Sequence, residues 1–499
     1  MSYQALEARF GELSHLNHAE AILGWDEAVM MPKGSGDVRG QALATLAGVI
    51  HEKLTAPDMG DLLANAAASG GQLSELQQCN LREMRRLWRD ATALPADLVR
   101  ARQIAVSRCE QVWRVKRAEN DWHGVVLQLG EVIDRVKEIA DCYAELDGTS
   151  PYDALLSRNQ PGITEVEVEQ IFGSLQVFLP EFVDKIIAAQ PAGVALPDGF
   201  TVARQHALGE RLMGTLGFDF DKGRLDVSHH PFSGGVPDDT RITTRYAKDG
   251  FLNAQMAVLH ETGHGLYQQG LPVAWREQPL GDHAGTAVHE SQSLLMEMQV
   301  ARSRPFLQFV APIMQEMLTG MVHPDPAWAG ENLYAQATKV QRGLIRVDAD
   351  ELSYPLHVIL RFDLERKLLS GMLRLVDLPD AWDGAMRNFL NISTRGNYRD
   401  GCMQDVHWYS GAFGYFPCYT LGALMAAQLF AAARKAIPNV ESQIGKGELA
   451  PLRDWLRANV HTKGRQFSMQ ALLKQVTGEP LNTKHFIDHA KRRYLRQGW

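Results

Sequence analysis

Apolar residues recur at helical spacing along most of the chain, and polar or charged residues occupy the positions between them. In the segment LSELQQCNLREMRRLWRDAT (73–92), the apolar side chains fall on one face of a helix and the charges on the other. Thr164, followed by Glu165 and Glu167, has the pattern of a helix start. The spacing predicts a mostly helical protein, with helical segments over 1–24, 36–55, 73–92, 97–145, 164–189, 251–269, 284–303, 306–319, 328–343, 349–370, 379–391, 417–436 and 451–458.

Residues 218–247 interrupt this pattern. The stretch is rich in turn residues and contains short β-like pieces such as TRITTRY (240–246), so we expect a small β-hairpin or an irregular loop within the helical protein. A chain of 499 residues would ordinarily contain about three domains. Because no linker is long enough to separate independent domains, we expect a single helical domain over 1–499.

Composition and charge exclude several classes of function. Hydrophobic residues make up 45% of the chain and charged residues 22%, as in globular proteins, and the net charge of −8 argues against nucleic acid as the main partner. There is no run of about 18 uncharged apolar residues, so no membrane span is expected. The first residues carry Glu7 and Glu12 without an apolar core, which is unlike a signal peptide. Five scattered cysteines favour a reducing compartment, and the expected location is the cytoplasm.

His260, Glu261 and His264 form an H-E-x-x-H pattern inside AVLHETGHGLYQQG (257–270). Because each helical residue advances by about 100°, the two histidines lie about 40° and one turn apart and can bind the same ion. Zinc lowers the pKa of a bound water towards about 7, and a neighbouring carboxylate can take its proton. The pattern therefore predicts a zinc site with Glu261 as the general base, against the alternative of a chance pairing of histidines on a helix.

A third protein ligand is required, since catalytic zinc sites use three and leave the fourth position open. The longer pattern H-E-x-x-H-x-x-G-x-x-H is excluded, because Tyr267 and Gly270 stand where it needs Gly and His. Glu290, in the predicted helix 284–303, is the expected third ligand. Glu297 lies on the same helix face as Glu290, where it either supports a ligand or is a solvated glutamate.

Three neighbours of these residues add detail. Gly263 and Gly265 each cost about 1 kcal/mol relative to alanine inside a helix, which indicates that another backbone or the surroundings of the ion come close. His289 is adjacent to Glu290 but points elsewhere on a helix, so we interpret it as a packing or hydrogen-bonding residue.

An ordered set of motifs extends over nearly the whole chain. The motifs are LGWDEAVMMPKG (23–34), HPFSGG (230–235), DTRIT (239–243), HETGH (260–264), HESQS (289–293), IRVDADE (345–351), GCMQDVHW (401–408) and GYFPCYTLG (414–422). In this set the chain resembles the thermostable-carboxypeptidase family, the carboxypeptidase Taq type of zinc metallocarboxypeptidases.

The resemblance implies a large helical body with a long, deep substrate cleft between two halves, similar to neurolysin and angiotensin-converting enzyme. The metal would lie on the floor of the cleft, and the helices of residues 1–60 would cover it. The resemblance also implies release of single residues from free peptide C-termini, with broad specificity and poor tolerance of C-terminal proline. The resemblance further implies that the metal is zinc, that cobalt can replace it, and that the protein forms a homodimer.

The same resemblance points to Arg346 as the residue that binds the substrate carboxylate, for which the planar guanidinium is well suited. From the residues alone, any of the 51 lysines and arginines qualifies. Asp348 and Asp350 either orient Arg346 or cap the helix that follows.

His407, in the stretch similar to the Q-D-x-H-W pattern of the family, is the first candidate to stabilise the oxyanion. Tyr419 is the next catalytic candidate and Tyr415 a substrate-binding one, the alternative for both being core aromatic residues. Two other functions stay open, namely a zinc oligoendopeptidase or dipeptidase on a related cleft and a peptide-binding protein without catalysis. IRVDADE and GCMQDVHW favour a carboxypeptidase over the first, and the intact Glu261 argues against the second.

Overall fold

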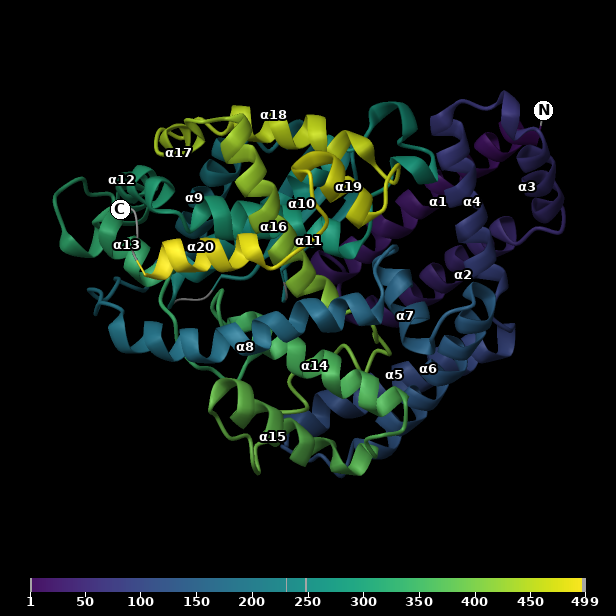
Figure 1. Cartoon of the computed structure of the whole chain (residues 1–499), viewed down its shortest axis with the longest axis horizontal. Coiled ribbons are helices and arrows are strands. Elements are labelled where there is room, and N and C mark those ends of the chain that lie inside the picture. Colours follow the sequence, from purple (N-terminus) through teal and green to yellow (C-terminus); the bar gives the residue numbers. More distant parts are fainter. Residues whose placement is uncertain (1, 230, 247–248, 496–499) are drawn as a thin grey trace. The chain divides into compact units, whose positions relative to one another are not determined.

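The computed structural model of the chain describes residues 2–229, 231–246 and 249–495. These residues are mostly α-helical with a small three-stranded sheet, which confirms the predicted fold class (Figure 1). They form two compact units, each assembled from separate stretches of the chain. The first unit comprises Met1–Ala91, Ala192–Ala337 and Met425–Leu481, and the second comprises Thr92–Pro191, Thr338–Leu424 and Asn482–Trp499.

Helices make up most of each unit. The first unit contains α1 (Ser2–Val29), α2 (Gly36–Leu54), α3 (Met59–Ala68), α4 (Glu75–Thr92), α9 (Val202–Leu216), α10 (Phe251–Gly270), α11 (Thr286–Leu294), α12 (Arg304–Thr319), α13 (Gly330–Ala337), α17 (Val440–Ile444), α18 (Ala450–Asn459) and α19 (Met469–Thr477). The second contains α5 (Ala96–Ala118), α6 (Val126–Asp147), α7 (Pro151–Asn159), α8 (Glu165–Ala189), α14 (Tyr354–Leu369), α15 (Leu378–Leu390) and α20 (Lys484–Tyr494). The chain passes from the second unit to the first within α16 (Pro417–Ala436).

Helix boundaries follow the predictions where local signals are strong. Thr164 and Glu167 form a capping box at the start of α8, as the sequence indicates. The helical pattern over 97–145 divides into α5 and α6, because Asn120 adopts a left-handed backbone conformation with φ 57° that ends a helix.

Two predicted helices were too long. The prediction over 328–343 is wrong beyond α13, and the helix expected over 349–370 begins only with α14. The reason for the later start is local, since the Asp350 carboxylate accepts hydrogen bonds from the backbone N–H groups of Leu352 and Ser353 and fixes a turn there.

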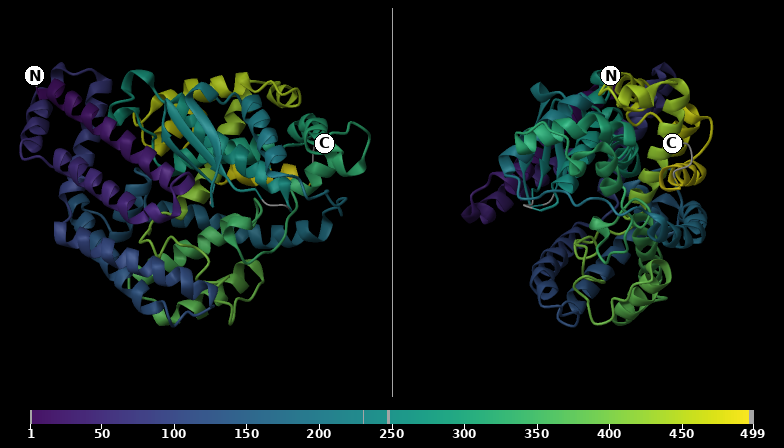
Figure 2. Two further views of the ribbon diagram at one scale, coloured as in Figure 1. Left: turned by 180° about the vertical axis from the view of Figure 1, so that it is seen from behind. Right: turned by 90° about the vertical axis from the view of Figure 1, so that its left-hand side faces the viewer.

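The three-stranded sheet lies in the first unit and contains the predicted hairpin (Figure 2). Strand β2 (Phe232–Val236) pairs antiparallel with β3 (Asp239–Thr244). Strand β1 (Gly223–Val227), which was not predicted separately, pairs parallel with β3 on its other side. Gly235 is required in the hairpin, because its φ of 85° is left-handed and a Cβ atom there would collide with the carbonyl oxygen of Asp239.

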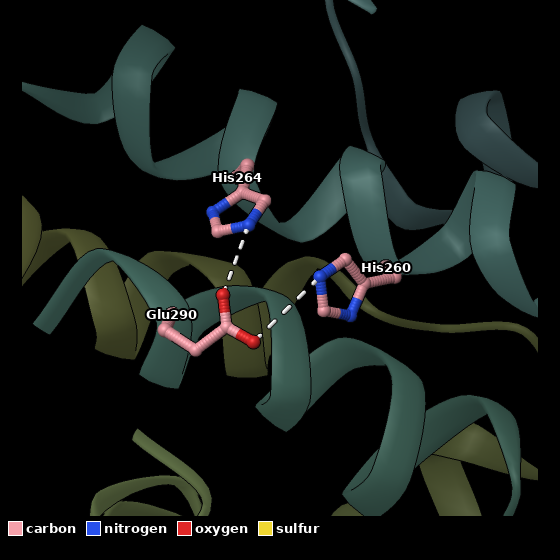
Figure 3. A group of neighbouring side chains, drawn as sticks. All are labelled: His260, His264 and Glu290. Atoms are coloured by element: carbon pink, nitrogen blue, oxygen red, sulfur yellow. Dashed lines mark ion pairs between the residues drawn. The ribbon is translucent and has the colours of Figure 1, made fainter. Parts of the chain in front are cut away.

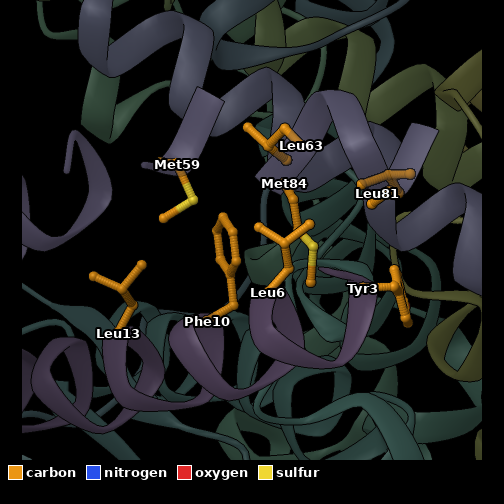
Figure 4. Close-up of a cluster of buried hydrophobic side chains, with 9 residues drawn as sticks. Tyr3, Leu6, Phe10, Leu13, Met59, Leu63, Leu81 and Met84 are labelled. Carbon is orange, nitrogen blue, oxygen red and sulfur yellow. The ribbon is translucent and has the colours of Figure 1, made fainter. Parts of the chain in front are cut away.

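Helix α10 is the centre of the first unit, and most of its residues are buried. It packs against β2 and β3, against α9, and against α11 and the π-helical turn η6 (Leu295–Ala301) that continues α11. Elsewhere in this unit, α1, α3 and α4 share an apolar core made of Tyr3, Leu6, Phe10, Leu13, Met59, Leu63, Ala66, Leu81 and Met84 (Figure 4). Among the described helices, none has the length and apolar character needed to cross a membrane.

Candidate metal centre

Helices α10 and α11 bring His260, His264 and Glu290 together (Figure 3). The two histidines lie one turn apart on α10, as the H-E-x-x-H spacing predicts. Nε2 of His264 is 3.4 Å from one carboxylate oxygen of Glu290, and Nε2 of His260 is 3.9 Å from the other. One nitrogen of each histidine and one oxygen of Glu290 all lie within 4.8 Å of one another, so a single metal ion can contact all three.

Close packing of the two helices depends on Gly263. A Cβ atom at this position would come within 2.5 Å of the carbonyl oxygen of Gln292 and 2.6 Å of the Cα atom of Ser293, both on α11. The helix backbones therefore approach each other directly, as the cost of glycine in a helix indicates. Gly265 faces side chains instead, since a Cβ atom there would be 2.8 Å from the ring of Phe218.

Glu297 fixes the orientation of the His260 ring. Its carboxylate oxygen lies 2.9 Å from Nδ1 of His260, which places the proton on Nδ1 and directs Nε2 towards the metal centre. Arg302 donates hydrogen bonds of 3.0 and 2.8 Å to the other oxygen of Glu297. Glu297 belongs to the π-helical turn η6, a local irregularity that recurs at functional sites.

His289 orients the second histidine ligand. Its Nδ1 atom is 2.5 Å from Nδ1 of His264, which confirms a hydrogen-bonding role. Burial and the neighbouring histidines hold the pKa of His289 well below its ordinary value, so its ring is neutral and can accept a hydrogen bond from His264. Nε2 of His264 is thereby left to face Glu290.

The charges of the centre are strongly coupled. Burial disfavours the imidazolium form of His260, but Glu290 and Glu297 outweigh it and raise the pKa of His260 to about 10. Burial likewise opposes ionisation of Glu297, yet Arg302 and His260 lower its pKa to about 2. The centre thus gathers the carboxylates of Glu290 and Glu297 around two imidazole rings, and this concentration of negative charge favours a divalent metal.

Glu261 has a different environment from the ligands. Its side chain is buried, one carboxylate oxygen, Oε2, has no hydrogen-bond partner among the described residues, and burial raises its pKa above the ordinary value. A buried carboxylate without a partner is costly, so it indicates a group that acts on a bound molecule. Two imidazole nitrogens and one carboxylate form a donor set of the kind found in hydrolytic metal sites. The neighbouring carboxylate of Glu261 is not part of that set.

Removal of the Glu297 carboxylate is expected to weaken metal binding. Replacing Glu297 with alanine leaves Nδ1 of His260 without its acceptor, and the expected loss of metal affinity is about 10–100-fold. Glu297→Gln keeps an acceptor and should lose less. Competition with a chromophoric chelator measures both affinities, and an unchanged affinity in Glu297→Ala would show that Glu297 has no orienting role.

Arg346 lies in the second unit, where Asp405 holds it rather than either of the acidic residues near it in sequence. Its Nη2 atom donates to Oδ1 of Asp405 at 2.8 Å and its Nη1 atom to the hydroxyl of Tyr354 at 2.5 Å. Asp350 instead makes the turn before α14, while Asp348 is exposed. Asp350 therefore does not orient Arg346, and it fixes the turn that leads into α14.

A second arginine shares Asp405. Arg361 is fully buried, and its Nε atom donates to Oδ2 of Asp405 at 2.7 Å. Burial opposes ionisation of Asp405, but Arg361 and Arg346 hold its pKa far below the ordinary range. Sequence analysis missed both partners of this network, although Asp405 lies within the GCMQDVHW motif. The sequence did contain a signal for this network, because the motif places Asp405 two residues before the candidate residue His407.

His407, Tyr415 and Tyr419 gather close to Arg346 in the second unit. Nε2 of His407 is 3.2 Å from the hydroxyl of Tyr419, and the guanidinium carbon of Arg346 is 4.9 Å from the centre of the Tyr419 ring. The rings of Tyr415 and Tyr419 are 5.4 Å apart. Burial and Arg346 lower the pKa of His407 to about 4, so its ring is neutral at pH 7.

The DTRIT motif contributes an ion pair within the sheet. Nε and Nη2 of Arg241 donate to the two oxygens of Asp239 at 2.8 and 2.9 Å. The guanidinium of Arg241 also lies 4.3 Å from the ring centre of Trp25 on α1. His230, the first residue of the HPFSGG motif, lies outside the described residues.

Comparison with known proteins supports the metal centre. The family described as carboxypeptidase Taq (M32) metallopeptidase matches residues 5–494. Thermostable carboxypeptidase 1 of Thermus thermophilus is 35% identical, over 99% of this chain and 98% of that protein. Carboxypeptidase 1 of Bacillus subtilis is 29% identical, over 97% and 96% of the two chains.

Solved structures agree with this assignment. Metallocarboxypeptidase 1 of Trypanosoma cruzi superimposes with a TM-score of 0.96 at 38% identity and 99% coverage of both chains. The M32 carboxypeptidase of Deinococcus radiodurans gives 0.94 at 36% identity, again with 99% coverage of each chain. With the family match and the cluster of two histidines and a glutamate, these likenesses show that the chain belongs to the carboxypeptidase Taq (M32) family and is a metallocarboxypeptidase.

Proposed function

We propose that this metallocarboxypeptidase is a zinc enzyme that releases single residues from the free C-termini of peptides, with broad specificity and with C-terminal proline disfavoured. The observation that carries the proposal is the convergence of His260, His264 and Glu290 beside the buried carboxylate of Glu261. Nitrogen and carboxylate ligands in this combination suit zinc, and cobalt accepts the same ligands.

In the proposed mechanism, His260, His264 and Glu290 hold the ion. When bound, zinc supplies a Lewis acid that polarises the scissile carbonyl and makes a water acidic enough to react at neutral pH. Glu261 receives the proton of the attacking water on its unpartnered Oε2 atom and transfers it to the leaving amine. The raised pKa of Glu261 suits the first step, because a carboxylate of higher pKa is a stronger base towards the attacking water. The leaving amine is more basic still, so it can take the proton from the carboxyl group in the second step.

We assign recognition of the C-terminal carboxylate to Arg346. Asp405 and Tyr354 occupy three of its five N–H groups, which leaves two for a substrate oxygen pair. His407 and Tyr419 are proposed to donate hydrogen bonds to the oxyanion, and the neutral state of His407 leaves one ring nitrogen as donor and the other as acceptor. Tyr415 is assigned to substrate binding beside Tyr419.

Loss of the Arg346 guanidinium should impair only substrates with a free carboxylate. A hydrogen bond to a charged group contributes about 1.5–3 kcal/mol, so Arg346→Ala is expected to lower kcat/KM for such peptides roughly 10–100-fold, mainly through KM. Residual turnover of the C-terminally amidated twin should hardly change. Arg342→Ala, which removes another arginine paired with an aspartate in the same unit, is the control. Equal losses on both peptides would reject the anchoring role.

A zinc oligoendopeptidase or dipeptidase is the alternative for the finer specificity. Three peptides distinguish the possibilities by mass spectrometry: one with a free C-terminus, its amidated twin, and a version ending in proline. The proposal predicts stepwise shortening of the first peptide only, abolished by a chelator and restored by zinc or cobalt. Internal cleavage of the amidated peptide, or release of dipeptides, would contradict it.

Three further proposals concern the oligomeric state, the location in the cell and the arrangement of the substrate site. We propose a homodimer, to be measured by sedimentation. We propose a cytoplasmic location, with which the five free cysteines agree. We also propose that the groups around Glu261 and Arg346 serve one peptide substrate, within a single peptidase domain whose N-terminal helices cover the cleft.

A further inference from the structure

A pocket of about 330 Å³ lies in the first unit where α10 ends. It is formed by three segments that are distant in sequence, namely the end of α10 with the turn after it, the turn before β1, and α18 with the turn that follows. Its volume is at the lower end of the range for small-molecule sites, which is about 300–1,000 Å³. No residue of the metal centre lines it.

Three cationic side chains line this pocket: Lys222, Arg276 and Arg457. Lys222 and Arg276 share one counter-ion, Asp238, with Nζ of Lys222 3.1 Å from it. Asp219 also lines the pocket, and its carboxylate accepts the backbone N–H of Asp221. The group therefore carries one more positive than negative charge.

Arg457 is the cation of this group that makes no ion pair, although Asp219 lies near enough to attract its charge. Its guanidinium forms no hydrogen bond or ion pair with any described residue, and its Nε atom is buried without a partner. Burial and the nearby Arg453 lower the pKa of Arg457, but an arginine remains charged at neutral pH. A partly buried arginine without an acceptor is unusual, because each desolvated N–H group costs free energy until it is paired.

The walls of the pocket are held by contacts to the metal-bearing helices. The side-chain amide of Gln269 on α10 donates to the Asp219 carbonyl at 2.8 Å and its oxygen accepts the Asp219 N–H at 3.1 Å. Gly270 lies so close to His461 that a Cβ atom would meet its ring at 2.5 Å. His461 in turn hydrogen-bonds Gln292 of α11 at 3.0 Å. These contacts therefore fix the walls of the pocket to the two helices that carry the metal-binding residues.

We propose that this pocket binds a small molecule that carries an oxyanion, either a carboxylate or a phosphate group. The guanidinium of Arg457 presents paired N–H donors of the kind that bind two oxygens of one anion, and Lys222 adds a point charge. One anionic group neutralises the single excess positive charge. The inference concerns binding alone and does not depend on the chemistry proposed for Glu261.

Isothermal titration calorimetry of the zinc-loaded full chain tests this site, with sodium phosphate and sodium succinate as separate probes and chloride holding the ionic strength constant. We expect saturable one-site binding of one or both probes. Arg457→Gln and Lys222→Gln should each weaken it at least fivefold. Arg453→Gln is the matched control, because Arg453 is one turn away on α18, pairs with Asp454, and does not line the pocket; it should change the affinity less than twofold.

The pattern of the two probes identifies the ligand class. Binding of phosphate alone indicates a phosphate-bearing ligand, binding of succinate alone a carboxylate, and binding of both a pocket that accepts either. No saturable binding of either probe would overturn the proposal. Equal affinity in wild type and Arg457→Gln would overturn it too, because it would place the anion elsewhere, including at the metal. If Arg457→Gln does not fold, Lys222→Gln decides alone, since that side chain is 44% exposed.

Discussion

Replacing Glu261 with glutamine is expected to reduce kcat by about 10²–10⁴-fold while the protein keeps its metal. Glu261 is not among the three side chains whose donor atoms converge, so its charge is not needed to hold the ion in place. Glutamine has nearly the same shape but cannot accept the proton of the attacking water. The loss should therefore appear in kcat, with KM almost unchanged, as expected for an interaction made in the transition state.

Glu316→Gln, an exposed change on α12 of the same unit, is the control for the Glu261 variant. Metal content by mass spectrometry and kinetics on the same sample separate the two possible causes of inactivity. Full activity in Glu261→Gln would remove it as the general base. Inactivity accompanied by metal loss would instead assign Glu261 to metal binding.

Replacing Glu290 with glutamine is expected to release the metal. Glu290 is the one carboxylate among the three converging side chains, and its oxygens face Nε2 of both histidines. Its negative charge offsets that of a divalent ion, which a neutral amide does not. The loss of affinity should exceed the roughly 10–100-fold expected for the supporting residue Glu297, and activity should fall in proportion to metal occupancy.

Chelator competition and activity at increasing zinc concentration measure this effect. Activity of Glu290→Gln should recover only at zinc concentrations far above those that saturate the wild type, as should that of His264→Ala. Glu316→Gln again controls for the change of charge. Metal binding by Glu290→Gln with wild-type affinity would mean that the third ligand is another residue.

Sequence analysis was most accurate where function depends on local spacing. The helical period alone places His260 and His264 on one face, and the cost of Gly263 correctly indicated a neighbouring backbone. The sequence left two alternatives for Glu297, namely support of a metal ligand and exposure to solvent. The hydrogen bond between Glu297 and His260 decides it, because only the packing of two helices determines which side chains meet.

Contacts between residues distant in the sequence were not predictable in the same way. Orientation of Arg346 by the acidic residues near it was one of two alternatives, but Arg346 pairs with Asp405, which also binds the buried Arg361. Nothing local in either segment encodes that contact. The parallel pairing of β1 with β3 likewise joins strands that are not consecutive in the chain, whereas the hairpin of β2 and β3 follows from a short turn.

The most direct test of the metal centre is an anomalous diffraction measurement at the zinc edge on crystals of the zinc-loaded Glu261→Gln variant. The account predicts one peak per chain, about 2.0–2.2 Å from Nε2 of His260, Nε2 of His264 and a carboxylate oxygen of Glu290. It also predicts Nδ1 of His260 still bonded to Glu297. A peak at other residues, or no peak in crystals of the zinc-loaded variant, would contradict it.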